Sequence, residues 1–210
     1  MRNFTMSSLR KTLLPFLFMH TFFSSLYADY TIIAMDDIAV VIPVKVVVAP
    51  VKSEQRRFLE AINKVRSQAH DCGTENGTVY GVMGPSAPLT WNDKLYRAAQ
   101  MHNNDMAQAD FFSHTGSGTS TDLAAQALHP GTGSTPSERI EYQGYSWSAY
   151  GENLAGGQNT LDEAISAWLN SPGHCANLMN SAFTEVGMSH VIDQGATYVN
   201  YWTQDFGKPQ

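Results

Sequence analysis

The sequence predicts an α+β domain of layered helices and strands, because its helical patterns come first along the chain and its strand patterns last. Apolar residues recur at three- and four-residue spacing in the first half, which is typical of amphipathic helices. Alternating patterns rich in β-branched and aromatic residues close the chain, which is typical of strands. The 210 residues are 43% hydrophobic, which suits one domain with a packed core and excludes wholesale disorder.

Two helices are expected in the first half of the domain. One is predicted over 53–70, with Ser53 as its N-cap, and the other over 92–109, with Asn92 in that role. The segment 71–90 between them carries four glycines and two prolines, which favours a loop. Their apolar faces consist of Phe58, Leu59, Ile62, Val65 and Ala69, and of Leu95, Ala98, Ala99, His102, Met106 and Ala109.

The second half predicts shorter helices followed by a hairpin. Segment 112–134 is rich in Gly, Ser and Thr, which favours a loop with one short helix at 121–128. Capping boxes at Thr135–Glu138 and Thr160–Glu163 open two helices, which end near Gln143 and Asn170. Segments 185–192 and 197–206 are then predicted as strands, with a turn between them.

The N-terminus is typical of a secretory signal peptide over residues 1–28. Basic residues precede the 15-residue apolar stretch Leu13–Tyr27, and Ala28 stands at a plausible cleavage position. The stretch is short for a membrane span, which needs about 20 apolar residues, although an uncleaved anchor remains the alternative. The sequence therefore predicts a secreted protein, extracellular or periplasmic.

The remaining chain is expected to form an extended leader over 29–52 and a domain over 53–208. Cleavage would remove three basic residues and no acidic one, so the net charge would change from −6 to −9. That charge argues against binding to nucleic acid or to anionic lipid. We expect a monomer that binds a small or peptide ligand, with no stable membrane insertion of the mature domain.

Three ionisable residues stand in turn-rich surroundings and are the candidate site residues: His114, Glu152 and His174. Two imidazoles and a carboxylate can bind a divalent metal, form an acid–base pair, or form a buried hydrogen-bond network. Spacing alone leaves the three possibilities open. Ser171 beside His174 is a weaker candidate nucleophile, because the Pro172-Gly173 pair that follows favours the end of a helix.

Other polar and aromatic residues are predicted to be structural. His102 lies on the apolar face of the second helix, which favours a core histidine with a satisfied hydrogen bond. Trp202 and Phe206 alternate with polar residues on the last strand and are expected in the core.

Cys72 and Cys175 are the only cysteines of the chain. In an oxidising compartment they are expected to form one disulfide, which would hold His174 in place, whereas two buried thiols are the alternative. Closing a loop of this length is worth up to about 5 kcal/mol in the chain-entropy model.

Six short motifs resemble the CAP superfamily of cysteine-rich secretory proteins, insect venom antigens, plant pathogenesis-related proteins and secreted bacterial relatives. They occur in the family's order and span about residues 53–207, and the Asn-Ser-Pro-Gly-His form is similar to the bacterial branch. The motifs are Leu89-Thr-Trp-Asn-Asp-Lys-Leu95, Phe112-Ser-His114, Gly151-Glu-Asn-Leu-Ala155, Ala167-Trp-Leu-Asn-Ser-Pro-Gly-His174, Phe183-Thr-Glu-Val-Gly187 and Tyr201-Trp-Thr-Gln-Asp-Phe206.

The resemblance implies a three-layer α-β-α sandwich, in which helices cover both faces of a three-stranded antiparallel sheet. It also implies a surface cleft that holds two His and two Glu. His114, Glu152 and His174 match three of these four, whereas the position of the second Glu is Ser171 in this chain. One carboxylate of the expected set is therefore absent.

Together these observations predict a secreted protein that binds a lipid, peptide or cell-envelope ligand in a cleft lined by His114, Glu152, His174 and Ser171. Zn²⁺ is expected between His114 and His174, with at most one carboxylate and otherwise water as its remaining ligands, and its binding is expected to weaken below about pH 6. The alternative is a peptidase or esterase in which the His and Glu residues, with or without metal, activate water. In a third reading the polar residues serve only as a scaffold.

Overall fold

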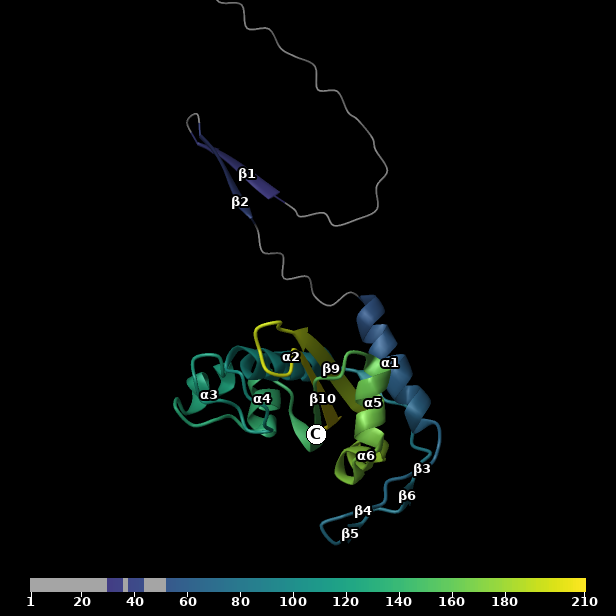
Figure 1. Ribbon diagram of the computed structural model, residues 1–210. Helices are drawn as coiled ribbons and strands as arrows, with labels where there is room; N and C mark the ends of the chain where they lie inside the picture. Colours follow the sequence, from purple (N-terminus) through teal and green to yellow (C-terminus); the bar gives the residue numbers. More distant parts are fainter. Residues whose placement is uncertain (1–29, 36–37, 44–51) are drawn as a thin grey trace, which may run out of the picture. The chain divides into compact units, whose positions relative to one another are not determined.

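The computed structural model describes residues 30–35, 38–43 and 52–210 (Figure 1). The chain divides into two units, residues 1–48 and 49–210, and each is described by itself. In the first unit, β1 (Tyr30–Met35) and β2 (Ile38–Pro43) pair as antiparallel strands, with Tyr30 opposite Pro43. The segment expected as an extended leader therefore contains a hairpin, whereas the predicted signal peptide lies outside the described residues.

The second unit is built on a four-stranded sheet with the strand order β7-β9-β10-β8. The long strands β8 (Trp147–Gly156), β9 (Glu185–Ile192) and β10 (Asn200–Pro209) are antiparallel, as expected. The short β7 (Thr90–Trp91) adds a parallel fourth strand beside β9. Because β10 is central and β8 lies at the edge, residues of β8 are within reach of loops from both helical layers.

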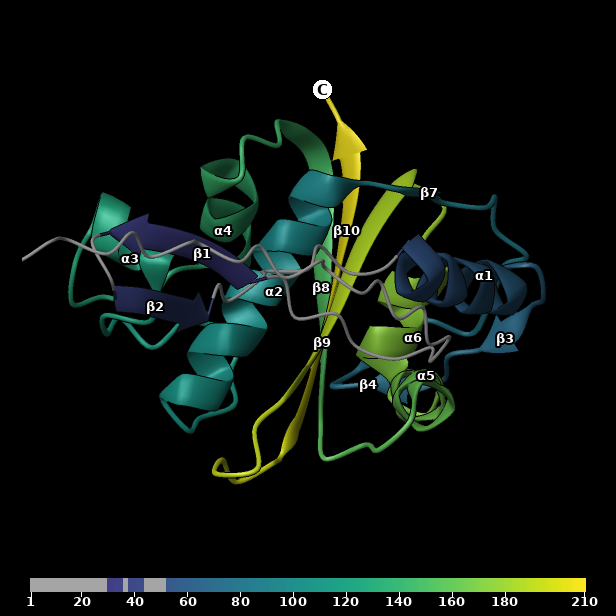
Figure 2. The ribbon, with the colours of Figure 1, turned by 90° about the horizontal axis from the view of Figure 1, so that it is seen from above.

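Helices cover both faces of this sheet (Figure 2). On one face lie α2 (Asp93–Gln108), α3 (Leu123–Leu128) and α4 (Pro136–Tyr142), and α2 packs directly against β9 and β10. On the other face lie α1 (Lys52–Arg66), α5 (Leu161–Leu169) and α6 (Pro172–Met179). The predicted α-β-α sandwich is confirmed. None of the described helices has the length and apolar content needed to cross a membrane.

The largest part of the core lies between the sheet and the layer formed by α1, α5 and α6. Trp202 is in edge-to-face contact with Phe58, with ring centroids 6.2 Å apart, and Phe206 stacks on Phe183 at 5.2 Å. Trp168 is also buried and donates its indole N–H to the carbonyl of Leu154 at 2.8 Å. The predicted core positions of Trp202 and Phe206 are confirmed.

Two local predictions were wrong, and one of them concerns a residue beside the candidate site. The glycines around Glu152 indicated a turn, but Gly151 lies within strand β8, where a Cβ atom would come within 2.8 Å of the Phe183 ring. The predicted helix end before Pro172 is confirmed, because α5 ends at Leu169 with Asn170 as its C-cap. The sequence did not predict that Pro172 and Gly173 form the first turn of a new helix, α6, where proline is tolerated because an N–H at this position would have no partner within the helix.

The second concerns the loop predicted over 71–90, which contains short strand pairs. β3 (His70–Asp71) pairs with β6 (Val82–Met83), and β4 (Thr74–Glu75) pairs with β5 (Thr78–Val79). Glycines with positive φ at Gly73, Gly77 and Gly81 supply the reversals between these strands. The loop thus has a defined shape, and its strand β4 lies against α6.

Both predicted capping boxes are present, and the contribution of one to stability can be tested by substitution. The Thr160 side chain accepts a hydrogen bond from the Glu163 N–H at 3.2 Å, while the Glu163 carboxylate accepts one from the Thr160 N–H. We expect Thr160→Ala to lower the free energy of unfolding by about 1 kcal/mol, the usual cost of a lost N-cap. Urea unfolding would measure this, and Thr160→Ser should retain wild-type stability.

Candidate functional site

The site is organised around Glu152, which lies on the edge strand β8 and faces the α2 layer. Its side chain is 1% exposed. The next residue, Asn153, points to the opposite face because side chains alternate along a strand. There its amide donates to the carbonyl of His174 at 3.1 Å, and Asn177 of α6 donates to the carbonyl of Glu152 at 3.2 Å. Strand β8 is thereby connected to the helix that carries His174.

His114 and Glu152 form a direct pair. The His114 Nδ1 lies 2.7 Å from Oε1 of Glu152, and the imidazole is 52% exposed. The other carboxylate oxygen, Oε2, accepts a hydrogen bond from Nη2 of Arg139 at 2.7 Å. An exposed imidazole is therefore attached to a buried ion pair.

Arg139 also holds the loop that carries His114. Its Nη2 donates to the carbonyl of His114 at 2.9 Å, and its Nη1 donates to the carbonyl of Ser134 at 2.8 Å. The guanidinium is 1% exposed, so these bonds form away from water. Arg139 thus positions both the backbone of His114 and the Glu152 carboxylate, which the His114 ring contacts.

The electrostatics keep Glu152 ionised. Burial alone would raise the pKa of the Glu152 carboxyl, but the charge of Arg139 and the hydrogen bonds from His114 and Arg139 outweigh it and lower this pKa to about 2. An ionised carboxylate only accepts hydrogen bonds, so Nδ1 of His114 is the donor in this pair. In the neutral imidazole, Nε2 then carries a free lone pair.

A second buried carboxyl lies next to Glu152 on the neighbouring strand. Asp205 of β10 is the residue opposite Glu152 in the strand register and is 1% exposed. Burial, and then the negative charge of Glu152, raise the pKa of Asp205 well above its ordinary value. Two adjacent buried carboxylates cannot both ionise cheaply, so the proton is held on Asp205 while Glu152 keeps its charge.

His174 lies on the first turn of α6, in the other helical layer. Its ring centroid is 6.4 Å from that of His114, and the two ring planes make an angle of 41°. Burial, and then the charge of His114, lower the pKa of His174, so its imidazole is neutral at pH 7. The structure therefore brings together the three candidates His114, Glu152 and His174, which are widely separated in sequence.

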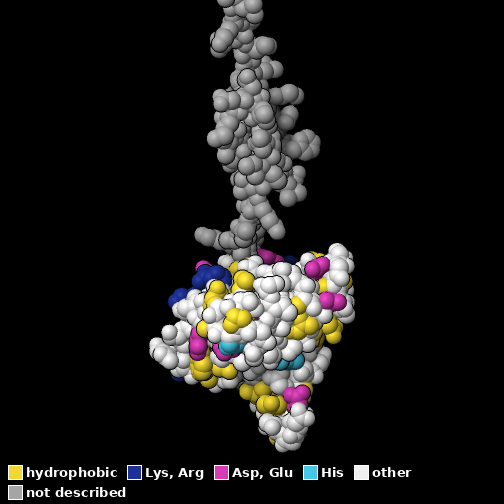
Figure 3. Space-filling view, turned by 90° about the vertical axis from the view of Figure 1, so that its left-hand side faces the viewer, with side chains coloured by type: hydrophobic (Ala, Val, Ile, Leu, Met, Phe, Trp, Pro, Cys, Tyr) yellow, Lys and Arg dark blue, Asp and Glu magenta, His cyan; other side chains and the backbone are white. Residues whose placement is uncertain are grey.

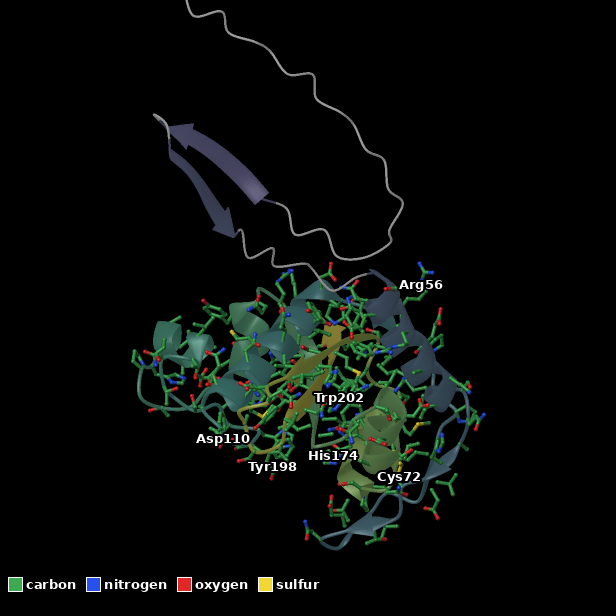
Figure 4. All side chains as sticks on the ribbon, turned by 45° about the horizontal axis from the view of Figure 1, so that its top comes forward. Arg56, Cys72, Asp110, His174, Tyr198 and Trp202 are labelled. Carbon is green, nitrogen blue, oxygen red and sulfur yellow. A yellow bond between two sulfur atoms is a disulfide. The ribbon has the colours of Figure 1, made fainter. Side chains whose placement is uncertain are left out.

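The predicted disulfide is present and lies directly beside His174. Cys72 and Cys175 are bonded, with Cα atoms 5.4 Å apart, and both are buried. Figure 4 labels His174 on α6 and Cys72 of the neighbouring loop close to it. The bond joins the loop over 70–83 to the first turn of α6.

The remaining candidates have structural positions. Ser171 is the N-cap residue of α6, but its side chain makes no capping hydrogen bond. His102 is fully buried and bonds the carbonyl of Ser113 through Nε2 at 2.8 Å, which confirms a core histidine that supports the loop of His114. Burial, and then the charge of Arg139, lower the pKa of His102 to about 4, so it stays neutral. Figure 3 shows surface histidines close to acidic and hydrophobic side chains on one face of the molecule.

The sequence did not predict a role for two residues of this arrangement, Arg139 and Asp205. Arg139 follows a capping box on a short helix, where an arginine is ordinarily solvated, so no local pattern marks it as buried. Asp205 left a weak signal, because it alternates with Trp202 and Phe206 and must therefore face the other side of the sheet.

The chain belongs to the CAP family: the model of the cysteine-rich secretory protein family matches residues 59–206. Two curated proteins of Bacillus subtilis (strain 168) are similar to it. The uncharacterized protein YkwD is 33% identical over 119 residues, or 57% of this chain, and the uncharacterized membrane protein YlbC is 30% identical over 122 residues, or 58%. The aligned part covers only 39% and 29% of their respective lengths.

Solved structures share the fold. An extracellular protein with an SCP domain from Bacillus anthracis str. Ames has a TM-score of 0.54 and 22% identity, covering 75% of this chain and 41% of that one. An outer surface protein from Borrelia burgdorferi has a TM-score of 0.51 and 21% identity, covering 76% of this chain and 92% of that one. Both similar proteins are described as extracellular or outer-surface proteins.

Proposed function

We propose that this is an exported CAP-domain protein whose cleft at His114, Glu152 and His174 binds a cell-envelope ligand, a peptide or a lipid, together with a divalent metal ion. Export is supported by the basic and apolar N-terminus and by the buried disulfide, which persists in oxidising compartments. The single observation that carries the proposal is the His114–Glu152–Arg139 arrangement, in which a buried ion pair orients an exposed imidazole.

The residues fit a metal ion of the zinc type. Zinc-binding histidines usually donate their second ring N–H to a carboxylate, which fixes the tautomer and leaves the other nitrogen for the metal. His114 has this arrangement toward Glu152, and the neutral His174 offers the second imidazole. When bound, the ion would supply Lewis acidity and a point of attachment for a ligand oxygen.

Metal affinity is expected to be modest. Within residues 52–210 of the described chain, no group of three or more His, Cys, Asp or Glu residues is placed to hold a metal ion. His114 and His174 would therefore be the two protein ligands, with the other positions taken by water or by the bound molecule. Such an incomplete coordination shell suits recognition of an external ligand.

The charge state of Glu152 favours binding over hydrolysis. An efficient general base needs a pKa near the working pH, whereas the pKa of Glu152 is lowered to about 2 by its partners. Both of its oxygens are also occupied, by His114 and by Arg139. Glu152 thus acts as a positioning residue for His114, and binding is the function that the geometry supports best.

Zinc titration of the purified protein tests the proposal. We expect His114→Ala to weaken Zn²⁺ binding at pH 7.5 at least about tenfold in calorimetry, because one of two protein ligands is lost. His129→Ala is the matched control, because His129 is also a surface imidazole paired with a carboxylate, that of Glu138. Unchanged zinc affinity in His114→Ala would remove this histidine from the site.

Thermal unfolding separates binding from a scaffold role. A protein that binds an added ligand in its native state unfolds at a higher temperature in its presence. We expect Zn²⁺ to raise the melting temperature of the wild type and to have a smaller effect on His114→Ala. Absence of a shift in the wild type with zinc, or with envelope fragments, peptides and lipids, would favour the scaffold reading.

A further inference from the structure

We infer that Glu75 is the second carboxylate of the cleft: it positions His174 and supplies the unpaired negative charge with which the cleft attracts a divalent cation. The inference deepens the proposed function and rests on it for the identity of the ligand. Nothing in the local sequence marks Glu75, which lies in the segment predicted as a plain loop. Its role follows from three observations of contact, restraint and charge.

The first observation is a direct contact with the turn that carries His174. Oε2 of Glu75 accepts a hydrogen bond from the N–H of Gly173 at 3.1 Å, across 98 residues of sequence. A Cβ atom at position 173 would come within 2.6 Å of the same oxygen. Glycine at 173 is therefore what allows the carboxylate to lie against the backbone beside His174.

The second observation is that this contact is restrained from both sides of His174. Gly173 is held by Glu75, and Cys175 is held by its disulfide to Cys72. The loop itself is kept in shape by the pairing of Glu75 with Thr78 in the β4–β5 hairpin and by the bond from the Cys72 N–H to the Gly81 carbonyl at 2.8 Å. The carboxylate is thus presented by a fixed loop.

The third observation concerns charge. The charge of Glu152 is compensated by the buried guanidinium of Arg139. Within the described residues, Glu75 has no Lys, Arg or His partner within ion-pair distance, and it is only half-buried. The negative charge that acts on the His174 side of the cleft is therefore that of Glu75, and a nearby negative charge favours the capture of a cation.

These observations also account for the serine at position 171. The family resemblance implies a carboxylate there, and the N-cap Ser171 supplies none. Glu75 brings a carboxylate to the same helix from the loop over 70–83. It is not itself placed as a metal ligand, since no three-residue ligand group is present among the described residues. It acts through position and charge.

The experiment compares Glu75→Gln, which keeps an acceptor oxygen and loses the charge, with Glu75→Ala, which loses both. Glu60→Gln on the exposed surface of α1 is the matched control. In calorimetry at pH 7.5, we expect Zn²⁺ binding about threefold to tenfold weaker in Glu75→Gln and unchanged in Glu60→Gln. In the metal-free proteins, NMR should show the Gly173 amide exchanging at least about tenfold faster in Glu75→Ala and near the wild-type rate in Glu75→Gln.

The two readouts separate this inference from the proposed function. If the wild type binds no zinc, the metal proposal fails, and the Gly173 exchange rate alone decides whether Glu75 positions the turn of His174. Equal exchange in the wild type and Glu75→Ala would overturn the positioning role. Wild-type zinc affinity in Glu75→Gln, with zinc bound normally by the wild type, would overturn the role of the charge.

Discussion

Replacing Arg139 by methionine is expected to lower the free energy of unfolding at pH 7 by about 3–5 kcal/mol, the usual cost of leaving one member of a buried ion pair alone. The variant would keep Glu152 buried without its counter-ion and would also lose the bonds to the carbonyls of His114 and Ser134. Urea unfolding followed by tryptophan fluorescence would measure the difference. Arg56→Met is the control, since Arg56 is exposed on α1 (Figure 4).

The effect of this substitution should depend on pH. In the wild type the lowered pKa of Glu152 means that its ionised form stabilises the fold above the pKa of the unfolded chain, and that this contribution is lost as the pH falls through about 2. Without Arg139, burial raises the pKa of Glu152, so the carboxyl takes up a proton more readily. The destabilisation of Arg139→Met should therefore be smaller at pH 4 than at pH 7.

A second variant makes the interpretation specific. Adding Glu152→Gln to Arg139→Met removes the unpaired charge and should restore part of the lost stability at pH 7. The hypothesis of a buried ion pair would be rejected if Arg139→Met were within about 1 kcal/mol of the wild type, by the scale of ordinary surface substitutions.

Removing the disulfide is expected to have a comparably large effect. The double variant Cys72→Ser, Cys175→Ser should lose about 2–5 kcal/mol of stability, the range for a native disulfide that closes a long loop. The loop over 70–83 would then keep its contact with α6 through the Glu75–Gly173 hydrogen bond and through the packing of Tyr80 and Met83 around Met179. Chemical denaturation of the wild type with and without reductant provides an independent comparison.

The same double variant should also weaken zinc binding, because the turn of His174 loses one of its two restraints. Cys72→Ala, Cys175→Ala tests whether the new hydroxyl groups rather than the missing bond cause the effect. Wild-type stability in both double variants would show that the covalent bond adds nothing to the packing around it.

Much of the fold could be predicted because its signals are local. Asn92 and the two capping boxes mark helix starts by hydrogen bonds within one turn, and the structure contains each of them. The hairpin of β9 and β10 is marked by alternation over adjacent segments. The disulfide was also predictable, since a chain with two cysteines leaves one intramolecular pairing.

The rest depends on contacts between distant parts of the chain. Gly151 lies in a strand because it pairs with Phe206 of β10, and a Cβ atom there would meet the Phe183 ring; no local pattern reveals either neighbour. The resemblance placed His114, Glu152 and His174 in one cleft, but Arg139 and Glu75 reach it through a short helix and a loop whose own sequences look like ordinary surface. Long-range partners of this kind become visible only in three dimensions.

The hydrogen bonds of Arg139 to two separate segments matter for attempts to redesign the proposed cleft. The Arg139 guanidinium is hydrogen-bonded both to the loop of His114 and to Glu152 on β8. Libraries that randomise position 139 would therefore contain few folded variants. Mutagenesis of the proposed site would better vary Ser171, whose side chain makes no capping hydrogen bond, and leave the anchoring arginine unchanged.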